Sequence, residues 1–136
     1  MTRYLLDTNV ISELRKNRPH GAVVAWFEDL RVEQIFISAV TMGELQTGVE
    51  RARRQDPAKA QEIEAWLSSV ELAYACVAMD SACFREWSRL VARTPNGPSE
   101  DAMIAATARV HGFTVATRNE KDFRQMGVPL FNPFRS

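Results

Sequence analysis

Short apolar runs alternate with longer amphipathic segments from one end of this 136-residue chain to the other. The runs that we expect to be strands are residues 4–6, 35–37, 76–79 and 113–117, with 128–131 as a last edge strand. Hydrophobic residues at helical spacing predict helices over residues 8–15, 21–31, 40–54, 57–70, 81–91, 102–110 and 119–126. Strands separated by helices imply a parallel sheet with helices on both faces. The sequence therefore predicts an α/β fold, a three-layer α/β/α sandwich around a central parallel sheet of four to five strands.

The chain has the length and composition of one ordinary globular domain, which we place at residues 1–136. Hydrophobic residues make up 46% and charged residues 25%, which excludes a disordered chain, a collagen and a multi-span membrane protein. No apolar run approaches the roughly 18 residues of a transmembrane helix, and Asp7 interrupts the amino-terminal segment before a signal peptide can form. We therefore expect a cytoplasmic protein without a membrane partner, in which Cys76 and Cys83 are small core residues.

Positive and negative charges balance, with 17 Lys and Arg against 17 Asp and Glu, so no overall positive field points to nucleic acid. Two local clusters of cations nevertheless stand out, namely Arg15, Lys16 and Arg18, and Arg51, Arg53 and Arg54. Arginine suits bidentate contacts with phosphate, whereas cations in general favour the carboxyl ends of helices. For each cluster both interpretations stay open.

Acidic residues follow the expected strands, at the edge where an α/β sheet binds its ligands. The four are Asp7 directly after the first strand, Glu44 one turn into the helix after the second, Asp101 in the first turn of the helix after the Pro-Gly loop 94–98, and Asp122 after the fourth strand. Crowded carboxylates repel one another and need a cation. A cluster of oxygen ligands suits a hard ion such as Mg²⁺ or Mn²⁺.

Each of these acids also has a purely structural explanation. Asp7 can cap the first helix, and Asp101 suits the positive end of its helix dipole. Asn119 with Asp122 three residues later resembles a capping box. Glu44 can be an exposed helix acid, although the apolar stretch around it would leave a carboxylate in want of a partner. The joint placement of four acids after strands favours a functional site over four separate explanations.

Motifs of several other enzyme classes are absent from the sequence. It contains no G-x-S-x-G nucleophile elbow, and no Walker or dinucleotide-binding glycine pattern. Trp26, Trp66 and Trp87 lie at helical core spacing, so we expect them in the core or at an interface rather than as stacking platforms for bases.

Four segments of the sequence resemble, in order, the motifs of PIN-domain nucleases. They are residues 5–12 (LLDTNVIS), 40–48 (VTMGELQTG), 101–108 (DAMIAATA) and 115–119 (VATRN), the last followed by Asp122 and Phe123. The similarity runs from about Leu5 to Pro133, which is nearly the whole chain. The chain resembles in particular the VapC-type toxins of bacterial toxin–antitoxin pairs, and its ending at 131–134 is similar to the FitB-like branch.

The resemblance implies a metal-dependent ribonuclease with RNA as its substrate. It also implies a homodimer, and inhibition by a cognate VapB- or FitA-like antitoxin. The acids of the family correspond to Asp7, Glu44 and Asp101, and the fourth position falls at Asp122 or at Asn119. Asp7 and Asp101 would bind Mg²⁺, or Mn²⁺ in its place, as one ion or two. The residues expected to support this site are Asn119, Thr117 and Asn9.

Two other classes of function compete with this hypothesis. In the first, the protein is a non-catalytic binding module whose acids only cap helices, and it acts through a partner on nucleic acid. In the second, Asp7 is a nucleophile in a hydrolase or phosphotransferase. The phosphatase form of that chemistry would place a second acid two residues after Asp7, where this chain has Asn9.

Overall fold

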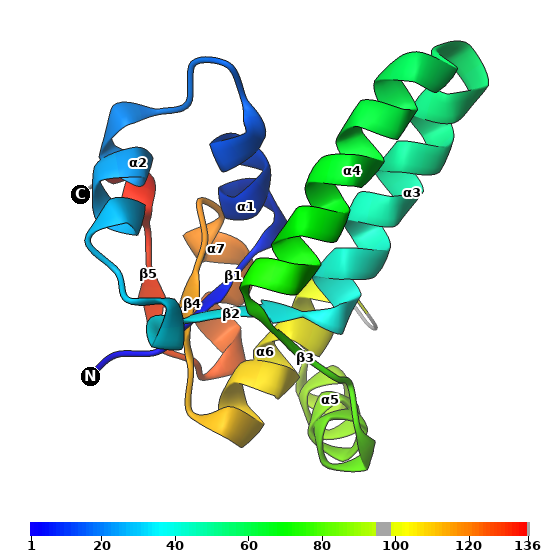
Figure 1. The fold of residues 1–136 in the computed structure, drawn as a ribbon. Helices are drawn as coiled ribbons and strands as arrows, with labels where there is room; N and C mark the ends of the chain where they lie inside the picture. Colours follow the sequence, from blue (N-terminus) through cyan, green and yellow to red (C-terminus); the bar gives the residue numbers. More distant parts are fainter. Residues whose placement is uncertain (95–98, 136) are drawn as a thin grey trace.

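Five parallel strands form one sheet at the centre of the computed structural model, which describes residues 1–94 and 99–135 (Figure 1). The strands are β1 (Tyr4–Leu6), β2 (Ile35–Ser38), β3 (Ala75–Val77), β4 (Thr114–Ala116) and β5 (Leu130–Phe131). They lie in the order β3-β2-β1-β4-β5, and every neighbouring pair is parallel. Each predicted strand is present, and the predicted parallel sheet is confirmed.

The helices occupy the predicted segments with small differences at their ends. They are α1 (Thr8–Arg15), α2 (Gly21–Glu28), α3 (Ala39–Gln55), α4 (Pro57–Ala73), α5 (Ser81–Arg93), α6 (Glu100–His111) and α7 (Glu120–Phe123), with 3₁₀ turns η1 (Val32–Gln34), η2 (Arg124–Met126) and η3 (Pro133–Arg135). The helix expected over 21–31 ends at Glu28, and the one expected over 119–126 is divided between α7 and η2. The loop predicted at 94–98 lies, apart from Thr94, outside the described residues.

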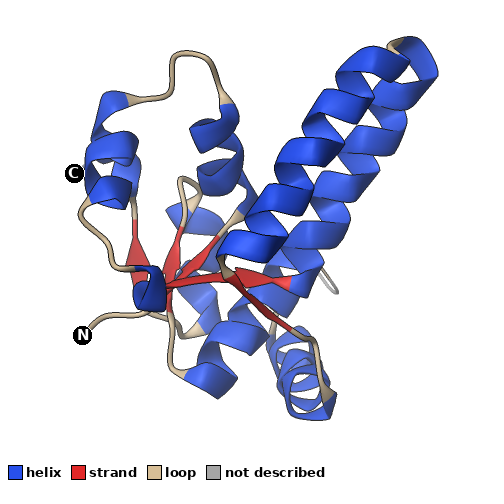
Figure 2. Cartoon of the chain, viewed as in Figure 1, coloured by secondary structure: helices blue, strands red, loops and turns tan. Residues whose placement is uncertain are grey.

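Two hydrophobic cores lie on opposite faces of the sheet, because successive side chains of a strand point to opposite sides. Leu5 packs with α5, α6 and α7 on one face, and Leu6 packs with α1, α2 and α4 on the other. Figure 2 shows the helices on both sides of the strands. A third, smaller core joins α3 to α4, which form the long helical hairpin that projects from the sheet in Figure 1. The predicted three-layer sandwich is confirmed.

The three tryptophans contribute to these cores, in agreement with the prediction. Trp87 packs against the first core, and Trp26 and Trp66 pack against the second. The prediction for the cysteines is half wrong: Cys83 is buried, but Cys76 is exposed because it lies on the edge strand β3. Within the described residues, no helix is both long enough and apolar enough to cross a membrane.

Candidate active site

Strand β1 ends at Leu6 and helix α1 begins at Thr8, so Asp7 lies between them at the carboxyl edge of the sheet. Asp7 is the N-cap of α1, and its Oδ1 accepts a hydrogen bond of 2.8 Å from the backbone N–H of Thr8. The Asp7 side chain is also in reach of three other acids, because the charges of Asp122, Asp101 and Glu44 each interact with it. The structural and the functional explanation of Asp7 are therefore compatible.

A buried carboxylate is costly unless it is hydrogen-bonded, and the protein supplies three donors to Asp7. Besides the Thr8 N–H, its Oδ2 accepts hydrogen bonds from the Thr117 hydroxyl at 2.8 Å and from the Asn9 amide at 3.1 Å. Burial raises the pKa of Asp7, and these three hydrogen bonds act in the opposite direction. The three donors fix the orientation of the Asp7 carboxylate.

Thr117 and Asn9, two of the predicted supporting residues, connect β1 to the loop after β4. Thr117 is fully buried, and its hydroxyl also accepts a hydrogen bond of 3.0 Å from the backbone N–H of Asn119. Asn9 Oδ1 accepts one of 3.0 Å from the backbone N–H of Arg118. The capping box expected at Asn119 and Asp122 is wrong, because the Asn119 side chain makes no cap hydrogen bond. The Asp122 side chain is thereby left available for another role.

Glu44 lies on α3, where it faces both the first helix and a further acid that sequence reasoning missed. Its Oε1 accepts a hydrogen bond of 3.0 Å from the Thr8 hydroxyl. Burial, then a shared hydrogen bond with Glu100, raise the pKa of Glu44 to about 7. Glu100 directly precedes Asp101 in the first turn of α6, and two consecutive acids there were the only signal for it in the sequence.

Asp101 completes the acidic group from the first turn of α6. Burial first, and then the charges of Asp7, Asp122 and Glu100, raise the pKa of Asp101 to about 6. The set of five acids is Asp7, Glu44, Glu100, Asp101 and Asp122, and none of them forms an ion pair with a Lys or Arg among residues 1–94 and 99–135. We refer to this set as the acid cluster.

The donor chemistry of the acid cluster fits a hard divalent cation. All of its ligating atoms are carboxylate oxygens, which Mg²⁺ and Mn²⁺ prefer. The cluster is not a closed cage: within the part of the chain that the structure describes, no three His, Cys, Asp or Glu side chains are already close enough to hold an ion. Mg²⁺ suits such an open site, since it keeps several of its waters and takes only one or two carboxylates.

Asp101 is partly buried and is repelled by the other acids of the cluster, and from this we predict its effect on stability in the absence of metal. The pKa of Asp101 is raised from 3.8 to about 6 on folding. The folded state therefore binds more protons between these values, and the contribution of Asp101 to stability falls as the pH rises through that window. Asp101→Asn removes this partly buried charge, so we expect it to raise the free energy of unfolding at pH 8. The gain should be only about 1 kcal/mol, because Asp101 is half-exposed and solvent screens its charge.

The measurement is thermal unfolding in EDTA at pH 8 and at pH 4. The variant should melt about 4 °C higher than the unchanged chain at pH 8. At pH 4 the two melting temperatures should converge, because Asp101 is then largely protonated in the folded state. A variant that is less stable than the unchanged chain at pH 8 would contradict the repulsion.

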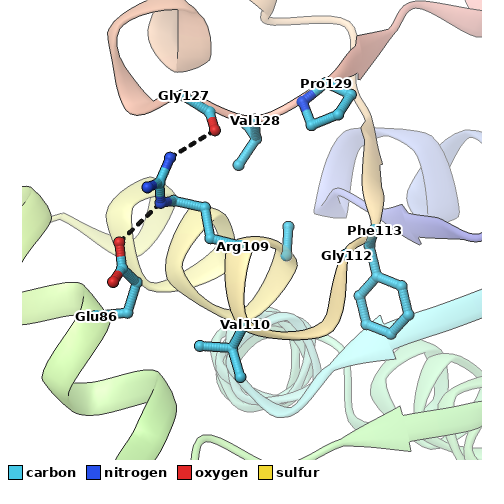
Figure 3. A pocket seen from close by; sticks show the side chains of 9 residues that line it. Glu86, Arg109, Val110, Gly112, Phe113, Gly127, Val128 and Pro129 are labelled. Atoms are coloured by element: carbon cyan, nitrogen blue, oxygen red, sulfur yellow. Dashed lines mark hydrogen bonds and ion pairs between the residues drawn. The ribbon is translucent and has the colours of Figure 1, made fainter.

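A hollow of about 370 Å³ lies away from the acid cluster, at the amino-terminal ends of β4 and β5 (Figure 3). Arg109 on its wall donates hydrogen bonds of 2.7 Å to Glu86 and of 2.7 Å to the carbonyl oxygen of Gly127. Gly127 has a φ of 65°, and a Cβ there would collide with the Arg109 guanidinium. These contacts tie α5 and α6 to the turn before β5. This hollow therefore has a structural explanation and contains none of the predicted site residues.

Comparisons with known proteins agree with this geometry. The family model described as PIN domain matches residues 4–129. The curated relatives include a VapC ribonuclease of Sinorhizobium fredii, 34% identical over 96% of this chain and 96% of its own length. They also include the toxin FitB of Neisseria gonorrhoeae, 35% identical over 96% of this chain and 97% of its own length.

A solved structure shares the arrangement of the elements as well. The crystal structure of FitAcB from Neisseria gonorrhoeae contains a chain that superposes with a TM-score of 0.86 and 34% sequence identity. The match covers 98% of the present chain and 99% of the other. A likeness at this identity and coverage extends to the whole sheet and to the elements that carry the acid cluster.

Proposed function

The chain belongs to the PIN-domain family, and from this premise we propose that it is the ribonuclease toxin of a toxin–antitoxin pair. In this proposal it hydrolyses RNA phosphodiester bonds with the help of a divalent cation, Mg²⁺ or Mn²⁺, and a small antitoxin neutralises it. The names of the relatives support the ribonuclease and the toxin. The acid cluster supports the dependence on a metal.

The observation that carries the proposal is the raised pKa of three acids that meet from separate elements. Asp7 follows β1, Glu44 lies on α3 and Asp101 begins α6, and the pKa of each is raised. Burial is the largest cause of each shift and the nearby acids add to it, and buried acids with raised pKa values cost stability and cluster at functional sites. A binding module would need only the cap that Asp7 provides to α1 and the favourable position of Asp101 at the start of α6, and neither explains Glu44.

In this proposal, different residues of the chain have different roles in hydrolysis. Asp7 and Asp101 would hold the cation, with Asp122 or Asn119 as a further ligand. A bound cation polarises the phosphoryl oxygen, lowers the pKa of a bound water and screens the developing charge. Thr117, Asn9 and the Thr8 backbone hold Asp7 in place through three hydrogen bonds, so little reorganisation is needed during the reaction.

In this proposal, Glu44 acts on the attacking water. Its Oε1 is oriented by the Thr8 hydroxyl at 3.0 Å. Glu44 also shares a hydrogen bond with Glu100. Once ionised and released from Glu100, its carboxylate can orient a water or accept its proton. The alternative role of Glu44 is that of a further metal ligand, and both roles need the same ionised carboxylate.

An apolar groove supports the proposal that an antitoxin binds to this chain. It has a volume of about 550 Å³ and lies between α1, α2 and α4. Its apolar lining includes Ile11, Leu14, Val24, Phe27 and Trp66. An amphipathic antitoxin helix could bury its apolar face in such a groove. The homodimer stays a prediction; the largely exposed Leu72 and Phe84, at 90% and 45%, are apolar surface that a second copy would cover.

The test of the proposed function is RNA cleavage by the purified chain without its antitoxin. We expect cleavage of RNA with Mg²⁺ or Mn²⁺ present and none in EDTA, with activity restored when the ion is added back. Mapping of the cut sites would identify the RNA. Binding of RNA without cleavage under any of these ions would contradict the ribonuclease and favour the binding module. Cleavage that is unchanged in EDTA would contradict the metal, and a trapped aspartyl-phosphate would point to Asp7 as a nucleophile instead.

A further inference from the structure

A hollow of about 270 Å³ adjoins the acid cluster, between the loop after β4 and the end of the chain. Basic side chains dominate its lining, which includes Arg118, Lys121, Arg124 and Arg135 together with Glu120 and Asp122. Asp122 belongs both to this basic hollow and to the acid cluster, because its charge also acts on Asp7 and Asp101. The two features are therefore neighbours on one surface.

Among the described residues, one of the four cations in the basic hollow forms an ion pair with a carboxylate. Arg135 is neutralised by Glu120, to which it forms an ion pair of 3.0 Å. Arg118, Lys121 and Arg124 are exposed, and none of them forms an ion pair with a carboxylate among the described residues. The charge of Arg118 also acts on Glu13, but no carboxylate of the described residues pairs directly with these three cations, so they are available for an anion from outside the chain.

Arg118 is held in place without using its charged donors. Its backbone N–H is bound by Asn9 Oδ1 at 3.0 Å, and its guanidinium lies over the ring of Phe134, 4.5 Å from the ring centre. A guanidinium that stacks on an aromatic ring keeps its in-plane N–H groups free for a bidentate contact with phosphate. Less side-chain entropy is then lost when the anion binds.

The two cation clusters that stand out in the sequence are more heavily occupied by contacts within the chain. Arg53 donates to Glu50 at 3.0 Å and to Glu64 at 2.9 Å. Lys16 forms an ion pair of 2.8 Å with Glu13, and the Arg15 guanidinium lies over the ring of Trp66. These contacts agree with the structural interpretation for Arg53, Lys16 and Arg15. Arg51 and Arg54 form no ion pair among the described residues, and the basic hollow is the better candidate for phosphate because Asp122 joins it to the acid cluster.

We propose that the basic hollow binds a backbone phosphate of single-stranded RNA next to the bond that is cleaved, through Arg118, Lys121 and Arg124. This inference rests on the proposed ribonuclease function and extends it. The chain has no net charge, and the acid cluster repels RNA, so a local positive site is needed to bring the substrate to it. Contacts with phosphate position the strand without reading its sequence.

The test compares two double variants that each replace two arginines by glutamine. Arg118→Gln/Arg124→Gln removes two cations from the basic hollow. The matched control, Arg51→Gln/Arg54→Gln, removes two exposed arginines of α3, which form no ion pair among the described residues. The readout is the affinity for a fluorescent single-stranded RNA in EDTA, measured by anisotropy over a series of KCl concentrations, with a gel to confirm that the RNA is intact.

We expect the hollow variant to lose affinity and salt dependence, and the control to retain both. For single strands each phosphate contact contributes about 0.7 to the slope of log K against log[salt], so two contacts reduce the slope by about 1.4. If the two proteins bind RNA equally at about 1 M KCl, this difference in slope makes the affinity of the hollow variant at 0.1 M KCl lower by a factor of about 25. In cleavage assays with Mg²⁺ the loss should appear mainly in KM.

Three outcomes would overturn the inference. Equal losses in both double variants would mean that only overall charge matters. Unchanged RNA binding by the hollow variant, together with weaker antitoxin binding, would assign the basic hollow to the antitoxin. In both cases a chain that still cleaves RNA leaves the proposed function standing. If the unchanged chain neither binds nor cleaves RNA, the proposed function fails as well.

Discussion

Asp7→Asn and Asp101→Asn are each expected to abolish Mg²⁺-dependent RNA cleavage while the fold remains intact. Both carboxylates belong to the acid cluster, and an amide in place of either removes a charged ligand of the proposed cation. Changes to outer-shell groups alone typically cost about 10- to 100-fold in metal affinity. For the loss of a ligand itself we therefore expect activity to fall by at least about a thousandfold on a sensitive fluorescent RNA substrate.

Asp29→Asn is the matched control for this prediction. Asp29 is exposed at the carboxyl end of α2 and belongs to no part of the acid cluster, so its variant should cleave at the rate of the unchanged chain. The fold of all three variants is checked by circular dichroism and thermal unfolding.

The two active-site variants should differ in stability. Asp101→Asn relieves repulsion and should stabilise the metal-free protein. Asp7→Asn gains less, because the new amide N–H₂ faces the Asn9 donor and one buried hydrogen bond is lost. Full activity in either variant, with the Asp29 control behaving as expected, would remove Asp7 or Asp101 from the site.

Most of the fold could be predicted from the sequence, because the patterns that indicate strands and helices are local. The apolar runs at 4–6 and 35–37 are short and bounded, and Asp7 caps the first helix where the sequence allowed a cap. The errors arise where burial depends on strand order. Cys76 has the character of a core residue, but β3 lies at the edge of the sheet, and strand order is a property of the whole chain.

The acids of the site were predictable for a related reason. In a parallel sheet the carboxyl ends of the strands share one edge, so residues that follow different strands in the sequence meet in space. Glu100 and the basic hollow were not predictable in this way. Glu100 interacts with Glu44 because α3 and α6 are in contact, and the Arg118 guanidinium lies over Phe134, which is 16 positions later in the sequence. Both depend on contacts between distant segments.

The second prediction with a large expected effect concerns inhibition in the complex of this chain with its antitoxin. The acid cluster has no Lys or Arg partner among residues 1–94 and 99–135, so an arginine of the antitoxin would find several carboxylates there. A guanidinium pairs with carboxylates bidentately and stays charged at any relevant pH. We expect the apolar groove between α1, α2 and α4 to supply most of the affinity, and the arginine to supply the inhibition by displacing the cation.

The test replaces each arginine of the antitoxin in turn with alanine and measures binding and inhibition separately. For one of them, the dissociation constant from calorimetry should rise only a few-fold, because the groove contacts remain. RNA cleavage should nevertheless return at antitoxin concentrations that saturate the toxin, to at least about a tenth of the free rate, since the acid cluster can again bind its cation. Added Mg²⁺ should also relieve inhibition by the unchanged antitoxin.

An arginine-to-lysine variant at the same position separates charge from shape. Lysine keeps the positive charge but lacks the planar pair of donors, so inhibition should be intermediate. Two results would contradict displacement of the cation. If binding and inhibition fall together for every arginine, the antitoxin inhibits through occupancy of the groove. If inhibition survives all the alanine variants and does not respond to Mg²⁺, the antitoxin blocks the approach of RNA or distorts the site, and the acid cluster plays no part in its recognition.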